Sequence, residues 1–170
     1  KMSATNAEKR TQVIDELVSI GHHIRIKILF HSLAFGALKP FINSGDNETL
    51  SKQNLEMTFD VMSNSLIYWA QDLFHNNLLK KGSQIFAMTS SGGHRQWKSY
   101  GAVSMAKAAL ESASRQLALE LAPYDIASNA IQAGVTDTPA LRKIPGNEEM
   151  IANAININPY KRLTTPQDIA

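Results

Sequence analysis

The side chains best suited to chemistry in this chain are Tyr100 and Lys107, seven residues apart in the segment SYGAVSMAKAALES. Seven residues of an α-helix turn through about 700°, so the two side chains are expected on one face, with a rise of roughly 10 Å between them. A phenol is protonated at neutral pH, and a nearby ammonium would favour the phenolate and sharpen the phenol as a proton donor. Such a pair could stabilise negative charge on a substrate oxygen, although the same spacing also occurs by chance on amphipathic helices.

Two short apolar segments are expected to position this pair. Residues 84–88 (QIFAM) indicate a buried strand, which ends in the small hydroxyl and glycine residues TSSGG. Residues 127–132 indicate a second strand, which opens into a loop of glycine and threonine residues. Between the two strands we expect a helix over 99–121 that carries Tyr100 and Lys107. Because ligands gather beyond the carboxyl ends of parallel strands, both loops are candidate binding segments.

The remaining periodicity predicts that strands and helices alternate along the chain. Apolar residues at helical spacing indicate helices over 6–20 and within 52–80, and residues 24–30 (IRIKILF) indicate a further strand. Short helices are expected up to about residue 158, and a last helix is expected to begin at Pro166. Strands that alternate with helices imply crossovers between parallel strands, which predicts an α/β sandwich.

This order of motifs resembles the short-chain dehydrogenase/reductase family over most of the chain. Most members of that family carry Tyr-x3-Lys, whereas here the residue four after Tyr100 is Ser104 and the spacing is Tyr-x6-Lys. That spacing, the following AALE, and the segment FHSLAFG at 30–36 resemble the enoyl-acyl-carrier-protein reductase branch. The segments TSSGG and TDTPALRKIPG are most similar to the divergent NADPH-using subgroup of that branch.

The resemblance implies a Rossmann-like three-layer α/β/α sandwich built on a parallel sheet. In the family this fold opens with a βαβ unit whose glycine-rich turn cradles the cofactor pyrophosphate. Neither Gly-x-x-x-Gly-x-Gly nor Gly-x-Gly-x-x-Gly occurs in the sequence. We therefore expect 1–170 to form a single partial domain that lacks the N-terminal glycine-rich unit and the C-terminal strand. Residues 139–160 are expected to be the mobile flap that covers the substrate.

The activity that the resemblance implies is reduction of a trans-2-enoyl thioester by NADPH or NADH in type II fatty acid synthesis. Tyr100 would stabilise the charge that develops on the thioester carbonyl oxygen, and Lys107 would hold the nicotinamide ribose. Enoyl reductases tend to place an aromatic residue ten positions before the tyrosine, where this chain has Ser90. Ser90 is therefore either a third catalytic residue that donates to the carbonyl, or a hydroxyl that bonds its own backbone at the strand end.

Two further segments match cofactor-binding segments of the family. The loop after strand 24–30 would pass beneath the adenosine and its ribose, and its candidate residues are Ser32, Leu33 and Ala34. The loop after strand 127–132 would contact the nicotinamide carboxamide, and its candidate residues are Gly134, Val135, Thr136 and Thr138. Apart from the resemblance, the first segment is an ordinary loop after a strand, and Thr138 is equally suited to cap a helix that begins at Pro139.

The composition argues against several other classes of protein. The net charge of +2 and the absence of a basic stripe argue against nucleic-acid binding. The chain has no cysteine, and its histidines show no metal-ligand spacing, so no metal site is expected. No run of about 20 apolar residues and no signal-peptide pattern occurs, so we expect a cytoplasmic protein without a membrane span.

The resemblance also implies an acyl-carrier-protein or CoA thioester as substrate and partner, and a homo-oligomer, either a dimer or a tetramer. Two other functions stay open at this point. One is a short-chain reductase that acts on a ketone, an aldehyde or an enone. The other is an inactive member that serves as an interaction module, which the missing glycine-rich turn favours.

Overall fold

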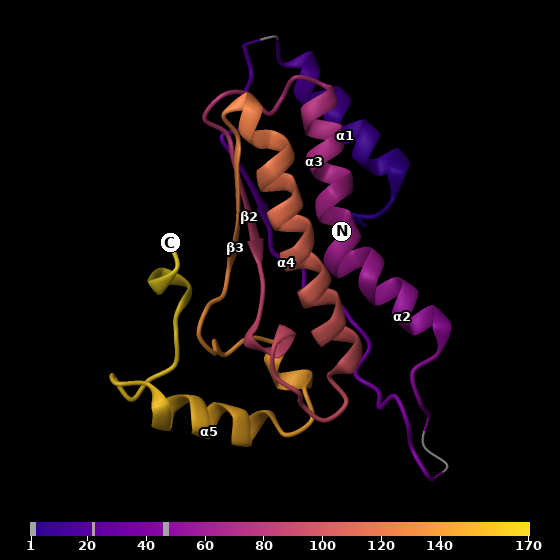
Figure 1. Cartoon of the computed structure of the whole chain (residues 1–170), viewed down its shortest axis with the longest axis vertical. Coiled ribbons are helices and arrows are strands. Elements are labelled where there is room, and N and C mark those ends of the chain that lie inside the picture. The colour runs from indigo at the N-terminus through magenta and orange to yellow at the C-terminus, as the bar shows by residue number, and fades with distance from the viewer. Residues whose placement is uncertain (1–2, 22, 46–47) are drawn as a thin grey trace.

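A parallel three-stranded sheet organises the computed structural model, which describes residues 3–21, 23–45 and 48–170. The strands are β1 (Ile28–His31), β2 (Gln84–Met88) and β3 (Ala127–Ile131), in that order across the sheet. Ile28 lies beside Gln84 in the register, and Gln84 lies beside Ala127, so all three strands point the same way (Figure 1). The chain therefore has the predicted α/β class with an open parallel sheet.

The helices whose apolar residues share a core with this sheet are α3 (Ser65–His75) and α4 (Gly101–Leu121). Strand β2 turns Ile85 and Ala87 into the core, and apolar residues of both helices cover them. The same core cluster contains Leu66, Ala70 and Leu73 of α3, and Leu110, Leu117 and Leu121 of α4. The edge strand β1 is less well covered than β2, since its Phe30 side chain is 49% exposed whereas Ile85 and Ala87 are fully buried. The spacing of the apolar residues of α3 is what indicated a helix there in the sequence.

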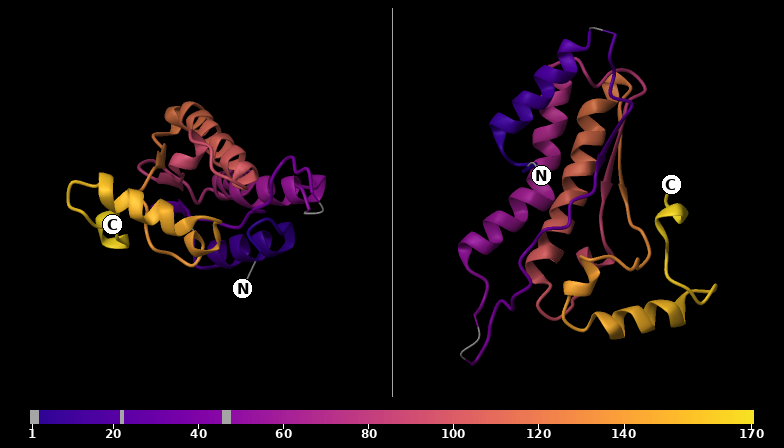
Figure 2. Two further views of the ribbon diagram at one scale, coloured as in Figure 1. Left: turned by 90° about the horizontal axis from the view of Figure 1, so that it is seen from below. Right: turned by 180° about the vertical axis from the view of Figure 1, so that it is seen from behind.

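Helix α1 (Ala7–Ser19) lies along α3, as the right view in Figure 2 shows. Its amino end is capped by the Asn6 side chain, which accepts a hydrogen bond from the Lys9 amide. An ion pair of 2.7 Å joins Arg10 to Asp72 of α3, and Ile14 enters the core. The predicted helix over 6–20 is therefore confirmed to within one residue at each end.

Strand β1 is shorter than the predicted strand over 24–30, and that prediction was wrong at its start. The amide of Ile26 donates to the carbonyl of Leu78, and the Ser83 hydroxyl donates to the carbonyl of Ile26. These bonds tie the segment before β1 to the turn that follows α3. The strand itself begins at Ile28 and continues through His31.

The predicted helical region within 52–80 is one continuous helix with an irregular middle. Helix α2 (Lys52–Phe59) passes into a π-helical turn over Asp60–Asn64, which passes into α3. Ser51 begins this helix with a capping box, in which its hydroxyl accepts from the Asn54 amide. Figure 1 shows that α2 bends away from the direction of α3. A π-turn of this kind is a recognised cause of a bend.

The chain after β3 lies beyond the carboxyl ends of the strands. A 3-10 turn over Leu141–Lys143 leads into α5 (Asn147–Ile157), and the chain ends in another 3-10 turn over Pro166–Asp168. Figure 1 places α5 across the lower end of the molecule, toward which the strands point, and the following segment returns alongside β3. Among the described residues, no helix combines the length and the apolar character needed to cross a membrane.

Candidate active site

Tyr100 lies at the amino end of α4, where it is the last residue before the helix begins at Gly101. Its carbonyl already accepts from the Ser104 amide, so the residue is bonded into the first helical turn. The ring lies against the loop after β2, because a Cβ atom placed on Gly92 would stand 2.4 Å from Tyr100 Cε1. Gly92 is thus needed for close approach of the loop to the tyrosine, which the sequence analysis did not single out.

The environment of Tyr100 keeps its hydroxyl protonated. Burial raises the pKa of Tyr100, and a hydrogen bond with the Ser90 side chain opposes that shift. The expectation that Lys107 would lower this pKa is not met, because burial and the Ser90 hydrogen bond are what shift it and the net direction is upward. A protonated phenol is still the form that can donate a hydrogen bond to a substrate oxygen.

Lys107 lies two turns into α4 and is only 5% exposed. Its Nζ donates to the carbonyl of Met88 at 2.6 Å and to the carbonyl of Leu33 at 3.2 Å. These carbonyls lie just at or beyond the ends of β2 and β1, so the amine bridges two neighbouring strand ends. Burial lowers the pKa of Lys107 from its ordinary value of 10.5 to about 8, which leaves the amine mostly charged at neutral pH.

The phenol and the amine converge on the carboxyl end of β2. Lys107 binds the carbonyl of Met88, and the Tyr100 hydroxyl meets the side chain of Ser90, two residues further on. Two residues of extended chain span about 7 Å. The shared-face arrangement predicted from the spacing therefore brings both groups to one edge of the sheet, together with Ser90.

The Ser90 side chain bonds its own backbone and also contacts Tyr100. Its Oγ accepts from the Gly92 amide at 3.1 Å, which starts the short 3-10 turn over Ser91–Gly93. The same side chain meets the Tyr100 hydroxyl. The backbone role predicted as the alternative is thus present, and the contact with Tyr100 keeps the hydroxyl at the site.

The candidate cofactor residues after β1 lie beside Lys107. Leu33 offers its carbonyl to the Lys107 amine, and Ser32 and Ala34 on either side of it are exposed. The loop then passes under α4 at Gly36, where an added Cβ would stand 2.7 Å from Cγ2 of Val103. The segment therefore presents its backbone and small side chains at the edge of the sheet where the amine lies.

The loop after β3 leaves the same edge of the sheet. Thr136 donates to the Gly134 carbonyl, and Thr138 accepts from the Leu141 amide at 3.1 Å. Thr138 thus caps the 3-10 turn, as the structural alternative predicted. The loop also contacts the C-terminal segment of the chain. The Thr164 amide donates to the Val135 carbonyl, and the Thr164 side chain leaves no room for a Cβ on Gly134.

His31 is a buried neighbour of the site that the sequence analysis did not select. It ends β1, it is 4% exposed, and its Nε2 lies 2.8 Å from the Ser65 Oγ. Burial first, and then the charge of Lys107, lower the pKa of His31 from 6.5 to about 4. The imidazole is therefore neutral at physiological pH. Its position in FHSLAFG was visible, but the sequence does not show that the ring turns inward.

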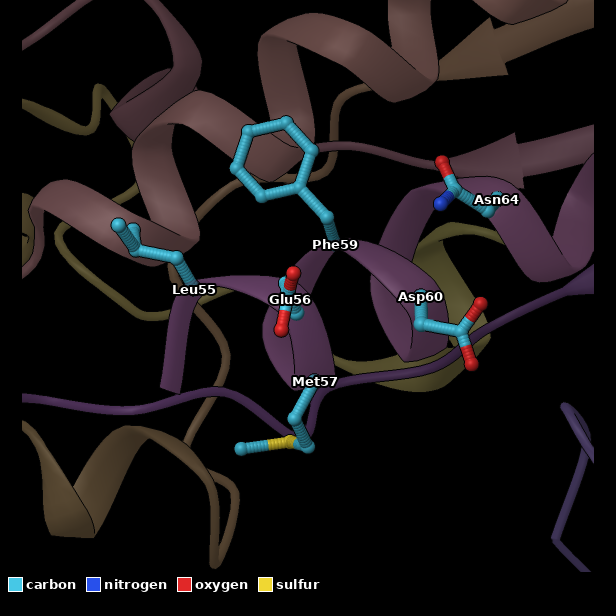
Figure 3. Close-up of a pocket in the computed structure, with 6 residues that line it drawn as sticks. All are labelled: Leu55, Glu56, Met57, Phe59, Asp60 and Asn64. Atoms are coloured by element: carbon cyan, nitrogen blue, oxygen red, sulfur yellow. The ribbon is translucent and has the colours of Figure 1, made fainter. Parts of the chain in front are cut away.

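A separate cavity of about 500 Å³ lies on α2 and the π-turn (Figure 3). None of the candidate catalytic or cofactor residues lines it. Figure 3 shows Leu55 and Phe59 on the side of α4 and Met57 pointing the other way. The residues that line this cavity are Leu55, Glu56, Met57, Phe59, Asp60 and Asn64.

Comparisons of the sequence with family models and with curated proteins point to the same family. A family model described as enoyl-(acyl carrier protein) reductase matches residues 1–170. The enoyl-(acyl-carrier-protein) reductase (NADH) FabI of Nostoc is 30% identical over 145 residues, which are 85% of this chain and 55% of the relative. The enoyl-(acyl-carrier-protein) reductase (NADPH) FabI of Staphylococcus aureus is 30% identical over 152 residues, 89% of this chain and 58% of the relative. The chain thus spans little more than half the length of these relatives.

Solved structures of similar fold carry related names. The enoyl-acyl carrier protein reductase of Bacillus cereus, solved with NADP+ and indole naphthyridinone, superimposes with a TM-score of 0.85 at 25% identity, covering 99% of this chain and 63% of that one. The NADH enzyme of Aquifex aeolicus gives a TM-score of 0.83 at 25% identity, covering 98% and 63%. The open parallel sheet described above is therefore that of the Rossmann-like reductases.

Proposed function

Because this chain belongs to the enoyl-(acyl carrier protein) reductase family, we propose that the protein reduces the trans-2 double bond of an acyl thioester with NADPH or NADH. The observation that supports this proposal most directly is the meeting of Tyr100, Ser90 and Lys107 at the end of β2. The relatives carry this activity in their names, with NADH in one case and NADPH in another. The reaction would serve type II fatty acid synthesis in the cytoplasm.

The residues at the sheet edge fit a nicotinamide cofactor. Two of the three N–H groups of the Lys107 ammonium are used by the Met88 and Leu33 carbonyls in the described contacts, which leaves one for a ribose hydroxyl. The exposed residues Ser32 and Ala34 offer small side chains beside that amine, where a flat ligand could approach the backbone. We assign Gly134, Val135, Thr136 and Thr138 to the nicotinamide side of the same edge.

When bound, the nicotinamide supplies the hydride. The chain's own contribution is to stabilise the substrate oxygen on which charge develops. Tyr100 donates its proton or a hydrogen bond to the thioester carbonyl oxygen, because burial keeps the phenol protonated. Ser90, which meets the Tyr100 hydroxyl, orients the phenol and can donate to the same oxygen. The charged Lys107, anchored to the Met88 carbonyl, would hold the cofactor ribose.

Turnover by the complete natural protein tests this proposal. With crotonyl thioester and each cofactor in turn, we expect loss of the reduced-nicotinamide absorbance. Tyr100→Phe should lower kcat by roughly 100- to 1000-fold, the range found when one donor to a developing oxyanion is removed. Tyr124→Phe is the matched control, since Tyr124 is exposed and packs edge-on against Phe74 at the other end of α4. Turnover of ketones or aldehydes but not of crotonyl thioester would favour the other short-chain reductases, and absence of cofactor binding would favour an inactive interaction module.

We further propose that residues 139–160 cover the acyl chain. Helix α5 lies across the carboxyl ends of the strands, and Met150 and Ile151 on it are half-buried. The segment 139–160 is joined to the chain between β2 and α4 by the Trp97 indole, which donates to the Pro145 carbonyl at 2.9 Å. Residues 1–170 would then contribute one partial reductase domain whose substrate mouth lies between α5 and the loop of Ser90.

A homo-oligomer, a dimer or a tetramer, is the assembly we propose. Helix α4 exposes Met105 and Leu119, at 46% and 70%, and their spacing of fourteen residues puts them near one outward stripe. The cavity on α2 adds the apolar Leu55 and Phe59 beside that helix. Light scattering coupled to size-exclusion chromatography should report a multiple of the protomer mass, and a monomer would contradict this part of the proposal.

The partner that we propose is an acyl-carrier protein or a CoA thioester. The basic residues near the flap are mostly paired within the chain. Arg142 makes two bonds to Asp137, and Arg162 makes two bonds to Asp168. Their charges are therefore partly neutralised, so the acyl group, rather than these arginines, is expected to carry most of the recognition.

A further inference from the structure

Glu111 is a buried carboxylate on the helix that carries the candidate catalytic pair. It lies one helical turn after Lys107 and is 8% exposed. Both of its oxygens are bonded: Oε1 accepts from the Thr89 hydroxyl at 2.6 Å, and Oε2 lies 2.7 Å from Nε2 of His94. Because an ionised carboxylate only accepts hydrogen bonds, the imidazole must present an N–H to it.

The two partners of Glu111 stand at opposite ends of the loop that follows β2. Thr89 is the residue before Ser90, and His94 is the residue after the 3-10 turn. Between them, the loop is also held close to α4 by its backbone, since a Cβ on Gly93 would lie 3.4 Å from Glu111 Oε1. One side chain therefore fastens both ends of a six-residue loop, Thr89 to His94, to α4.

This loop is the segment that touches the tyrosine. It contributes the Ser90 side chain that meets the Tyr100 hydroxyl and the Gly92 backbone on which the ring lies. Tyr100 precedes α4 and Glu111 lies within it, so the carboxylate ties the loop to the frame that fixes the phenol. Lys107 has its own attachments to Met88 and Leu33 and does not need this link.

We propose that Glu111 is a positioning residue, which sets the distance between Ser90 and Tyr100 by clamping the loop 89–94 at both ends. The inference rests on the proposed reductase function for its kinetic consequence, but the clamp itself does not depend on any activity. Without the carboxylate, the Thr89 hydroxyl and the His94 ring lose their common acceptor. The loop is then held mainly by its own turn and by the bond from the Thr89 amide to the Ile131 carbonyl.

The first arm of the test measures the loop directly, by amide hydrogen exchange in the complete natural protein. Glu111→Ala should speed exchange in peptides that cover 89–94 by roughly tenfold, the effect of losing about one net hydrogen bond of local stability. Glu120→Ala is the matched control, because Glu120 lies on the same helix, is exposed, and bonds only Gln116 in the described contacts. Unchanged exchange in Glu111→Ala would overturn the clamp, whether or not the protein is a reductase.

The second arm measures the consequence for catalysis. Glu111→Ala should lower kcat by about 10- to 100-fold through misplacement of Ser90. The dissociation constant of NADPH, followed by its fluorescence, should change less than about twofold because Lys107 keeps its attachments. Glu111→Gln should recover most of the activity, since its amide oxygen can accept from Thr89 and its N–H groups can meet the His94 ring.

A double-mutant cycle separates positioning from general weakening of the fold. If Glu111 acts through Ser90, Glu111→Ala combined with Ser90→Ala should be no slower than the slower single variant. Additive losses, or an equal loss of cofactor affinity and kcat, would overturn the positioning role. A wild-type protein without enoyl reductase activity would refute the proposed function alone, and the exchange arm would still decide the clamp.

Discussion

The Nζ atom of Lys107 lies 2.6 Å from the carbonyl oxygen of Met88, so the central helix is bonded to the end of the central strand. A second bond, to the Leu33 carbonyl, joins the same amine to the end of β1. The amine is therefore both a structural link between two strand ends and the charged group of the candidate site. To make both contacts, the charged amine is almost completely buried, so its ionisation should affect the stability of the protein.

Lys107 should make the protein more stable as the pH rises from neutral toward 10. Its pKa is about 8 in the folded chain and 10.5 ordinarily, so the unfolded chain binds more protons between these values and stability rises with pH. Denaturant unfolding of the wild type, minus that of Lys107→Met, should show a gain of roughly 2 to 3 kcal/mol between pH 7 and pH 10. Other lysines cancel in this difference. A flat difference would mean that the amine is more hydrated than its contacts imply.

His31 should cause loss of stability on mild acidification. Its pKa is about 4 in the folded chain against 6.5 ordinarily, so protons bind the unfolded chain preferentially between these values. Stability should fall by up to about 3 kcal/mol as the pH drops from 6.5 to 4, and His31→Gln should remove that dependence. The matched control is His75→Gln, because His75 is exposed and should leave the acid slope as it is. An unchanged slope in His31→Gln would contradict the inward position of the imidazole.

Gly92→Ala should disable the site while leaving the fold intact. The new methyl would stand 2.4 Å from Tyr100 Cε1, so the ring or the loop must move by about 1 Å to restore an ordinary contact. A displacement of that size near the reacting groups can cost about 100-fold in kcat. Gly45→Ala is the control, because nothing lies within 4 Å of a Cβ at that position. Equal activity of the two variants would show that the Tyr100 ring is not constrained by the loop.

Trp97→Phe should loosen the segment 139–160. The substitution keeps an aromatic ring beside Gly146 but removes the indole donor to the Pro145 carbonyl, at a cost of about 1 kcal/mol. Amide exchange should increase in peptides from α5, and the KM for the acyl thioester should rise several-fold, by about the factor that this energy represents.

Trp69→Phe provides the control for that experiment. It removes a similar bond, from the Trp69 indole to the Ala4 carbonyl, at the junction of α1 and α3. It should loosen α1 without changing exchange in α5. If both variants affect α5 equally, Trp97 has no specific connection to the flap.

Most of the secondary structure could be predicted because its signals are local. Strand β2 was predicted at its exact bounds, since an apolar run between a Lys-Lys-Gly turn and a hydroxyl-rich loop reads as a buried strand. Helix α4 was predicted to within two residues from its place between two strands, around Tyr100 and Lys107. The start of β1 was not, because Ile24 and Ile26 fit the alternation of a strand, but the Ile24 amide bonds the nearby Gly21 carbonyl and the Ile26 amide bonds Leu78 in the turn after α3.

The sequence predicted which candidate residues lie near one another, but not their environment. The spacing of Tyr100 and Lys107 placed both groups on one side of α4, and the loops were recognised by their position after strands. The burial that raises the pKa of Tyr100 and the contacts of Glu111 depend on how the loop 89–94 folds back onto α4. Glu111 was visible only as part of AALE, where an acidic residue ordinarily indicates a solvated helix face.

The π-turn over Asp60–Asn64 makes the relative rotation of α2 and α3 depend on the number of residues between them. It holds one residue more than an α-helical turn of the same rise, so the angular phase of α2 is offset from that of α3 by about 100°. This offset lets Thr58 accept from the Ala37 amide while Ser65 meets His31 on another side. Deletion of one residue from the turn would convert it to a regular α-helical turn and rotate Thr58 away from Ala37. The segment after β1 would then lose the hydrogen bond that the Ala37 amide donates to Thr58.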